Sequence, residues 1–345
     1  MFQFKVFNFT TFFLLFHLDS EDESNEPKFS ATSIKHAGTV NRLKFTALNA
    51  HNSTPVVAAW SDNGSVGIYD LSAAIFSLNN NENKIGGKKN KKKDLNDIGL
   101  AEDPLMFSFK GHSDEGFALD WSPTVSGNLI SGDLAGKIHI WLPHESTWSV
   151  DKNRPFSEHE DSVEDLQWSP TEKAVFSSCS TDKSIRVWDV RSANRSKSQL
   201  KIKNAHESDV NVISWNRKES SLLLSGGDDG VLKVWDFRNP KKPVACFEHH
   251  TQPITSVQWC PHDSSVFAAS GEDDQITLWD CGVEPDEDEN ANTNGEEDSL
   301  KVPPQLLFIH QGQKEIKEIR WYPHSVGVVL SVASTGLDVF RTVSV

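Results

Sequence analysis

One stretch of the chain gathers side chains of the types that bind metal ions. His249, His250, Cys260 and His262 lie close together in the sequence. Imidazole and thiolate are the donors that zinc prefers, provided that they converge on one centre. Cys260 and His262, however, flank a proline in an expected turn, and His250 has a place in the repeat described below. The sequence therefore favours no metal site, and it gives no indication of a cofactor.

Patterns for covalent or phosphoryl chemistry are equally unsupported. The chain has no Gly-x-Ser-x-Gly nucleophile elbow and no phosphate-binding loop ending in Gly-Lys-Ser or Gly-Lys-Thr. The sequence thus predicts a protein that binds rather than catalyses.

Histidine and tryptophan recur at a fixed spacing. The distance from the His to the second Trp is 29 residues in four units. These units are His112/Trp121/Trp141, His159/Trp168/Trp188, His206/Trp215/Trp235 and His250/Trp259/Trp279. A period of this length, with Trp-Asp at the end of the unit, is typical of WD40 repeats, each forming one four-stranded blade of a β-propeller.

A single unit has the pattern of a small antiparallel sheet. Strands are expected over 210–215, 222–224 and 231–235, separated by a polar turn and by the tight turn Gly226–Gly230. Both faces of such a sheet are apolar, so it must be stacked between neighbours to be stable.

An aspartate precedes the second Trp by six residues in three units, at Asp182, Asp229 and Asp273. By resemblance to WD40 repeats, this Asp and the repeated His orient the Trp through a buried hydrogen-bond network. The Trp141 unit has Ala135 in that place.

Two further units are degenerate. The first runs from His36 to Tyr69 with Asn63 at the Asp position, and the last runs from His310 to Phe340 with Ser334 there. We therefore expect an all-β WD40 propeller with six recognisable blades. Because the most similar families have seven, one N-terminal blade is missing or degenerate.

The overall charge restricts the class of partner. The chain has 49 acidic and 34 basic side chains, a formal net charge of −15. This balance disfavours direct nucleic-acid binding, which needs a basic surface, and favours basic partners. The four cysteines show no paired spacing, so an intracellular, reduced protein is expected.

The N-terminus differs from the rest of the chain. Residues 1–18 are apolar, but polar residues interrupt the run, no cleavage site follows, and it is short for a membrane span. An acidic run follows at 19–27. We expect residues 1–28 to be disordered or a mis-assigned start, and residues 29–345 to form the propeller.

Two inserts interrupt the repeats. The insert at 79–103 carries a lysine cluster, read either as a nuclear-import signal or as a solvated loop. Its members are Lys88, Lys89, Lys91, Lys92 and Lys93. The insert at 282–304 carries eight carboxylates and is expected to be an extended tether for a basic partner, or simply a soluble spacer. They are Glu284, Asp286, Glu287, Asp288, Glu289, Glu296, Glu297 and Asp298.

Five more residues are expected to take part in binding a basic partner. Glu115, Glu164 and Asp209 lie at the start of the first strand of their blades, where acids would surround a propeller's channel mouth. Leu306 and Phe308 would supply apolar contacts beside the acidic insert.

Longer stretches resemble one family in particular. The runs 116–123, 162–172, 209–215, 223–230 and 266–277, with 306–318 and 340–345, resemble the glutamate-rich WD-repeat proteins. That family is similar to the histone-binding WD proteins of chromatin assembly complexes. The resemblance implies a role in ribosome biogenesis in the nucleus and nucleolus, escorting a basic ribosomal protein, with histones as possible clients.

A different reading comes from two Trp-Asp-x-Arg sequences. Asp189 with Arg191, and Asp236 with Arg238, match the pattern by which WD40 substrate receptors dock on the adaptor of cullin-4 ubiquitin ligases. The alternative is that each Arg pairs only within its own blade.

Overall fold

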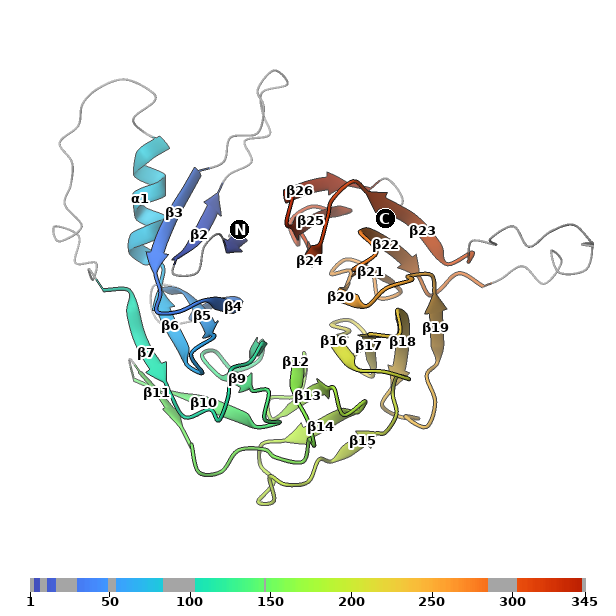
Figure 1. Ribbon diagram of the computed structural model, residues 1–345, viewed down its shortest axis with the longest axis horizontal. Helices are drawn as coiled ribbons and strands as arrows, with labels where there is room; N and C mark the ends of the chain where they lie inside the picture. Colours follow the sequence, from blue (N-terminus) through green and yellow to red (C-terminus); the bar gives the residue numbers. More distant parts are fainter. Residues whose placement is uncertain are drawn as a thin grey trace, which may run out of the picture. The chain divides into compact units, whose positions relative to one another are not determined.

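The repeat units form short antiparallel strands because apolar and β-branched residues alternate between turns rich in glycine and aspartate. A computed structural model describes residues 3–6, 11–16, 30–48, 54–82, 103–145, 147–284 and 303–342, with side chains from residue 33 onward except at 79–82. Figure 1 shows the arrangement.

Twenty-six strands and one helix are described, and six of the sheets follow the repeat units. The strands of the first two are β4 (Val40–Leu48), β5 (Thr54–Ser61), β6 (Val66–Asp70), β7 (Leu105–Phe109), β8 (Ala118–Trp121), β9 (Leu129–Gly132), β10 (Ile138–His144) and β11 (Thr147–Val150). The next two comprise β12 (Val163–Trp168), β13 (Val175–Ser180), β14 (Ile185–Asp189), β15 (Leu200–Ile202), β16 (Val210–Trp215), β17 (Leu222–Gly227), β18 (Val231–Asp236) and β19 (Ala245–Glu248). The last two comprise β20 (Ile254–Trp259), β21 (Val266–Gly271), β22 (Gln275–Asp280), β23 (Leu306–Gln311), β24 (Ile316–Trp321), β25 (Val328–Ala333) and β26 (Gly336–Arg341).

Each of these sheets is antiparallel, with its strands in chain order from one edge to the other. Five sheets have four strands, and the sheet β24-β25-β26 has three among the described residues. Each sheet corresponds to one expected repeat unit. The all-β blade architecture predicted from the spacing is confirmed.

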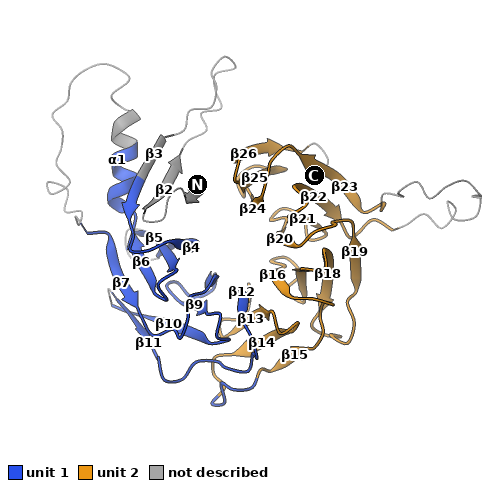
Figure 2. Ribbon diagram, viewed as in Figure 1, with its two compact units in different colours: residues 1–166, 193–197 blue, residues 167–192, 198–345 orange. Residues whose placement is uncertain are grey.

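The chain forms two compact units (Figure 2). Unit 1 comprises residues 1–166 and 193–197, and unit 2 comprises 167–192 and 198–345. Each unit has its own apolar clusters.

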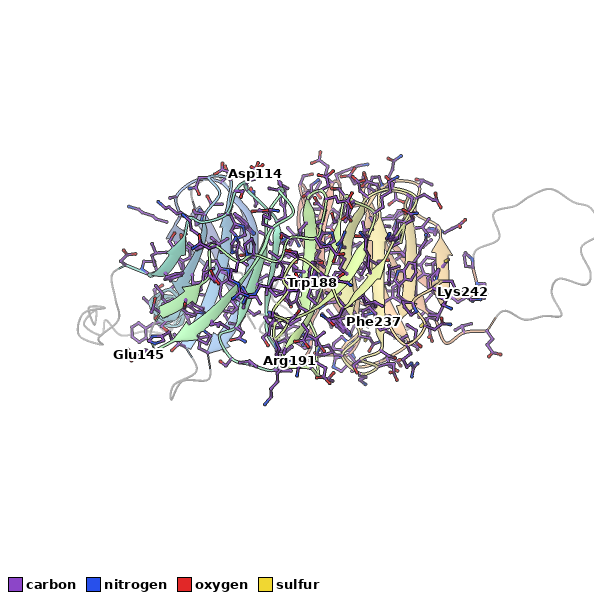
Figure 3. The ribbon with its side chains drawn as sticks, turned by 90° about the horizontal axis from the view of Figure 1, so that it is seen from below. Asp114, Glu145, Trp188, Arg191, Phe237 and Lys242 are labelled. Atoms are coloured by element: carbon purple, nitrogen blue, oxygen red, sulfur yellow. The ribbon has the colours of Figure 1, made fainter. Side chains whose placement is uncertain are left out.

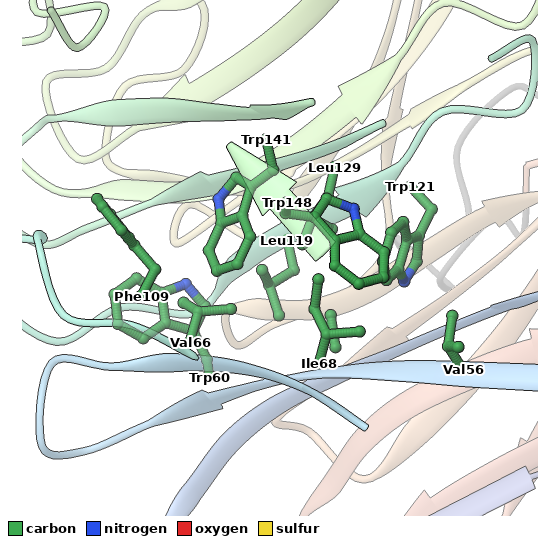
Figure 4. Close-up of a cluster of buried hydrophobic side chains, with 11 residues drawn as sticks. Val56, Trp60, Val66, Ile68, Phe109, Leu119, Trp121, Leu129, Trp141 and Trp148 are labelled. Atoms are coloured by element: carbon green, nitrogen blue, oxygen red, sulfur yellow. The ribbon is translucent and has the colours of Figure 1, made fainter. Parts of the chain in front are cut away.

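The main cluster of unit 1 lies between the sheets β4–β7 and β8–β11 (Figure 4). Trp60 and Trp141 are fully buried there, and Trp121 packs against Trp148 with ring centroids 6.2 Å apart. Trp148 lies on β11, the strand that covers Trp141, so the outer strand closes the core of its own blade.

Unit 2 repeats this packing. The buried Trp279 contacts Phe247 of the preceding blade, with centroids 5.0 Å apart, and stacks over Phe267 at 6.3 Å. The last Trp of a blade thus fills the space between two sheets.

Helix α1 (Ser72–Glu82) was not expected from the sequence. It begins where the Asp70 carboxylate accepts the N–H of Ser72, an N-terminal cap. Leu78 is buried beside Leu71 and Tyr69, so the helix covers the end of its blade. No helix among the described residues is long and apolar enough to span a membrane.

A seventh sheet involves the N-terminus. Strand β2 (Thr11–Phe16) pairs antiparallel with β1 (Gln3–Val6) on one side and with β3 (Ser30–Lys35) on the other. The run Thr11–Phe16 is rich in aromatic residues, which have high strand propensity. The rest of 1–28, most of the lysine insert and residues 285–302 lie outside the described residues.

Candidate functional site

A buried chain of polar groups links the repeated residues of unit 2. His206 Nδ1 lies 2.9 Å from the Asp229 carboxylate, and its Nε2 lies 2.8 Å from Ser225 Oγ. Trp235 Nε1 donates to the same hydroxyl at 3.0 Å. Because both ring nitrogens of His206 and the indole nitrogen of Trp235 have partners here, the network orients the Trp, as the repeat pattern predicts.

The next blade builds the same chain from a different residue. His250 Nδ1 contacts Asp273 at 2.9 Å, but its Nε2 lies 2.8 Å from Thr277 Oγ1, which also accepts Trp279 Nε1 at 2.8 Å. Ala269 of β21 occupies the position of Ser225, so the hydroxyl has moved from the second strand to the third.

In unit 1 the carboxylate of the network is Asp133, which the spacing did not predict. Asp133 Oδ2 lies 3.0 Å from His112 Nδ1, and Ser131 Oγ links His112 Nε2 to Trp141 Nε1. Burial lowers the pKa of His112. Burial would raise the pKa of Asp133, but the bonds and charge of His112 bring it below its ordinary value.

The carboxylate that contacts the histidine comes from one of two sequence positions, that of Asp133 or that of Asp229, and a glycine accounts for the difference. Gly227 is the counterpart of Asp133, two residues after the shared serine. A Cβ on Gly227 would lie 2.8 Å from His206 Nδ1, so no side chain fits when Asp229 approaches from two residues later. When the aspartate itself occupies that place, it contacts the histidine directly.

The last blade replaces the histidine. Gln313 is buried and accepts the hydroxyl of Ser331, the counterpart of Ser225, while its amide donates to Gly336 O at 3.4 Å. His310, which the sequence placed in this role, instead lies on β23 and stacks on Phe340.

These networks bring the turns of successive blades together at one end of unit 2. Asn211 Nδ2 donates to Ile254 O of the next blade at 3.3 Å, and Glu315 N donates to the Asp274 carboxylate of the preceding blade at 2.7 Å; within one blade, Asp228 N donates to Asp209 O at 3.0 Å. The end thereby collects carboxylates from three blades, here called the acidic end of unit 2. Its members are Glu207, Asp209, Asp228, Glu272, Asp274 and Glu315.

Two of the predicted binding residues lie together in unit 1. Leu134 N donates to Glu115 O at 2.9 Å, and Val163 N donates to Asp133 O at 3.2 Å, so Glu115 and Glu164 flank one turn. Asn41 Nδ2 donates to the Glu115 carboxylate at 2.8 Å, and Ser162 Oγ to that of Glu164. Asp114 lies in the same loop (Figure 3).

The predicted residues of unit 2 do not form one site. Asp209 precedes Val210, which pairs with Gly227 at the acidic end. Glu284 instead follows Asp280, and Leu306 pairs with Trp279, at the opposite end of β22. A strand of six residues separates the two, roughly 20 Å. The start of the acidic insert and the acidic end therefore face different ends of the blades.

Leu306 and Phe308 pack against the apolar clusters of the blades. Leu306 packs against the cluster around Trp279, and Phe308 against the cluster shared with the last blade. Both are half-buried because β23 is the outer strand that covers its sheet. The other carboxylates of the insert, from Asp286 to Asp298, lie outside the described residues.

The two Trp-Asp-x-Arg turns have the same geometry. Arg191 Nη2 lies 2.6 Å from Asp189, and Arg238 Nη2 lies 2.7 Å from Asp236. The arginine side chains are 72% and 71% exposed. Each arginine therefore pairs within its own blade and is also exposed.

Comparison with known proteins identifies the repeats. The family "WD domain, G-beta repeat" matches residues 151–189, 197–236 and 241–280. The chain is a WD40-repeat protein. The conclusion from the spacing of His and Trp is thereby confirmed.

Relatives extend the similarity to most of this WD40-repeat protein. It is 41% identical over 92% of its length to "Protein HEAT STRESS TOLERANT DWD 1" of Arabidopsis thaliana. It is 40% identical over 92% to "Glutamate-rich WD repeat-containing protein 1" of Dictyostelium discoideum, and 40% identical over 94% to "Ribosome assembly protein rrb1" of Schizosaccharomyces pombe. The resemblance to glutamate-rich WD-repeat proteins is confirmed. The chain spans 66%, 61% and 66% of these relatives, respectively.

The donors that could have bound a metal in this WD40-repeat protein are held elsewhere. His250 is bound to Asp273, His249 contacts Gln275 at 3.3 Å, and His262 Nε2 donates to Pro323 O at 3.1 Å. Cys260 is buried, which raises the pKa of its thiol. Among the described residues, no group of three or more His, Cys, Asp or Glu side chains is placed to hold a metal ion.

Proposed function

We propose that this WD40-repeat protein is a non-catalytic scaffold that binds a basic client during ribosome assembly, in the nucleus and nucleolus. The observation that carries the proposal is the acidic end of unit 2, where six carboxylates from three blades share one surface. The name of the fission yeast relative, a ribosome assembly protein, supports the process. We favour a basic ribosomal protein as the client, with histones second.

The carboxylates of the acidic end differ in their side-chain partners. Asp228 is bound to Asn211 at 2.7 Å, and Asp274 to Lys314 at 2.9 Å. Glu207, Glu272 and Glu315 are exposed and belong to turns that are fixed by backbone hydrogen bonds. A fixed turn presents its carboxylate without further ordering, so a basic segment laid across three blades meets charges already in place.

Charge of this kind mainly accelerates encounter. Each exposed ion pair contributes about 0.2–1 kcal/mol, and the attraction is screened beyond roughly 8 Å at physiological salt. We therefore expect the association rate of the client to fall as salt rises.

The test is a matched pair of triple variants in unit 2. Glu207→Gln, Glu272→Gln and Glu315→Gln remove three charges from the acidic end. Glu172→Gln, Glu219→Gln and Asp263→Asn remove three exposed charges from the other end of the blades. Binding of a purified basic ribosomal protein and of histone dimers is measured by calorimetry at two salt concentrations. From three exposed pairs, the first variant should weaken binding about 3- to 100-fold.

The control variant should bind like the wild type. Equal affinity for both variants, without salt dependence, would contradict the scaffold proposal. A third variant, with the carboxylates of residues 286–298 neutralised, measures the contribution of the insert separately. Preference between the two clients then decides between a ribosomal protein and histones.

A second candidate function is substrate reception for a cullin-4 ubiquitin ligase. The observation that favours it is the same Asp–Arg ion pair in two blades, Asp189 with Arg191 and Asp236 with Arg238. Each pair holds an arginine whose side chain is more than two-thirds exposed. Each carboxylate accepts Nε and Nη2 of its own arginine, which fixes the guanidinium group, and an exposed ion pair stabilises the fold little. These arginines are thus available to an acidic groove on an adaptor.

For this candidate we predict that Arg191→Ala with Arg238→Ala leaves the melting temperature unchanged and abolishes co-precipitation of the adaptor. Lys197→Ala with Lys241→Ala removes the same charge from neighbouring loops and serves as the control. Undiminished co-precipitation by the arginine variant would remove this function.

A further inference from the structure

Two loops of unit 1 are joined to each other through arginine side chains. The loops are residues 151–157 and 193–197, and both belong to this unit (Figure 2). Arg154 Nη2 donates to Ala193 O at 3.3 Å, and Arg195 Nη1 donates to Arg154 O at 2.7 Å. Each loop therefore holds the arginine of the other, and the two together are here called the arginine loops.

Phe156 anchors the arginine loops to their blade. Its backbone exchanges two hydrogen bonds with Ile138, the first residue of β10, at 2.9 and 3.0 Å, and its side chain is buried. The guanidinium carbon of Arg195 lies 5.1 Å from the centre of the Phe156 ring, a cation–π contact. Ser157 N donates to Arg195 O at 3.2 Å. Backbone and side chain of Arg195 are thus both fixed.

These hydrogen bonds leave the positive charge of the two arginines uncompensated. Both guanidinium groups donate to carbonyl oxygens, which carry no net charge. In the part of the chain that the structure describes, Arg154 and Arg195 form no ion pair, whereas Arg191 is paired with Asp189. A guanidinium group has five N–H donors in a planar fork, so a single bond leaves most of them for a ligand.

Two lysines extend the positive surface. Lys152 and Lys197 are exposed, one on each loop. The only acidic residue in the two loop sequences is Asp151, whose carboxylate accepts the N–H of Asn153 at 3.1 Å. The arginine loops therefore carry four positive charges and one negative charge, in a chain whose formal net charge is −15.

We propose that the arginine loops bind a short acidic segment of a partner protein. Each guanidinium fork pairs with one Asp or Glu side chain of the segment, and the two lysines meet further carboxylates beside them. This partner has the opposite charge to the client of the proposed function. The inference goes beyond that function and does not depend on it.

Two observations favour an acidic peptide over a nucleic acid. A long polyanion would extend past four positive charges onto a chain of strongly negative net charge, whereas a short segment need only cover the loops. Single-stranded nucleic acid also binds by stacking its bases on aromatic side chains. The one aromatic residue of the loops, Phe156, is 1% exposed and is covered by Arg195.

The probe is the capped peptide GSDEDDEDGS, with GSNQNNQNGS as the uncharged control. Binding is measured by calorimetry at two salt concentrations, and hydrogen exchange reports which backbone amides gain protection. We expect binding that weakens as salt rises, with the added protection in residues 151–157 and 193–197. Arg154→Gln with Arg195→Gln should weaken binding about 2- to 30-fold, as expected for two exposed ion pairs.

Further variants separate recognition from loss of folding. Lys152→Gln with Lys197→Gln changes no hydrogen bond between the loops and should also weaken binding. Lys35→Gln with Lys110→Gln removes two exposed positive charges from other parts of unit 1 and should bind like the wild type. Arg154→Glu with Arg195→Glu should reject the acidic peptide. The basic peptide GSKRKKRKGS should then protect the loops, a gain that an unfolded variant cannot show.

Three results would overturn the proposal. In the first, the acidic peptide protects neither loop. In the second, the lysine variant and its control bind the acidic peptide with the same affinity, so that the charge of the loops has no part in recognition. In the third, a single-stranded uridine dodecamer binds the loops more tightly than the acidic peptide, which would make them a nucleic-acid surface.

Discussion

Replacing Trp279 by alanine is expected to lower the free energy of unfolding by about 3–5 kcal/mol. The indole is fully buried between two blades of unit 2, against Phe247 and Phe267. Its removal leaves a cavity that these rings cannot close, and it also removes the N–H that Thr277 Oγ1 accepts. Urea unfolding followed by circular dichroism measures the loss.

Trp279→Phe separates the two contributions. Phenylalanine, the residue at the corresponding position 340 of the last blade, keeps an aromatic ring but has no N–H to donate. Thr277 retains His250 as a partner, so the expected cost is about 1–2 kcal/mol. If Trp279→Ala unfolded at the same urea concentration as the wild type, the cluster around Trp279 would not be a stabilising core.

The stability of unit 1 should fall by about 2 kcal/mol between pH 7.5 and pH 5 through His139 alone. Burial, together with the charge of His112, lowers the pKa of His139 to about 4. In the unfolded chain this pKa is near 6.5, so between pH 6.5 and pH 4 the unfolded state binds more protons. The stabilisation is therefore complete above pH 6.5 and is lost as the pH falls toward 4.

His139→Gln provides the comparison, because glutamine does not titrate and can donate to Asp151 O, which lies 3.3 Å from His139 Nδ1 in the wild type. Unfolding at several pH values should show a smaller slope for this variant between pH 7.5 and pH 5. The slope that remains belongs in part to His112, whose pKa is also lowered. Carboxylates with lowered pKa values, such as Asp133, change the free energy of unfolding mainly below pH 4. They therefore do not affect the difference in slope between the two proteins. Identical slopes in both proteins would contradict the assignment to His139.

Spacing predicted the blades because it is set by the length of the strands. A separation of 29 residues from His to Trp fits three strands and two turns, and every unit that shows it forms a blade in the structure. The tight turn at Gly226–Gly230 and the strands around it also follow their local sequence. Helix α1 did not, since its apolar face becomes clear only when Leu71 and Leu78 meet Tyr69.

The details of the polar networks were less accessible from sequence. Asp133, Thr277 and Gln313 perform roles that the repeat assigns to other positions, and each is recognised only by the atom it contacts. The binding residues show the same limit. Asp209 and Glu284 share a charge and a unit, but their position along the strands places them at opposite ends.

The hydroxyl that serves Trp279 has implications for how these repeats diverge. It belongs to Thr277 on β22, whereas the neighbouring blade holds it at Ser225 on β17. Evolution between the two arrangements must pass through a blade with both hydroxyls or with none. The former crowds a closed space, and the latter leaves His250 Nε2 and Trp279 Nε1 without that acceptor. The effect of a substitution at position 277 therefore depends on the residue at position 269. Thr277→Val alone should destabilise the blade, but it should be tolerated when Ala269→Ser is already present. A change acceptable in one blade is therefore no guide to its neighbour.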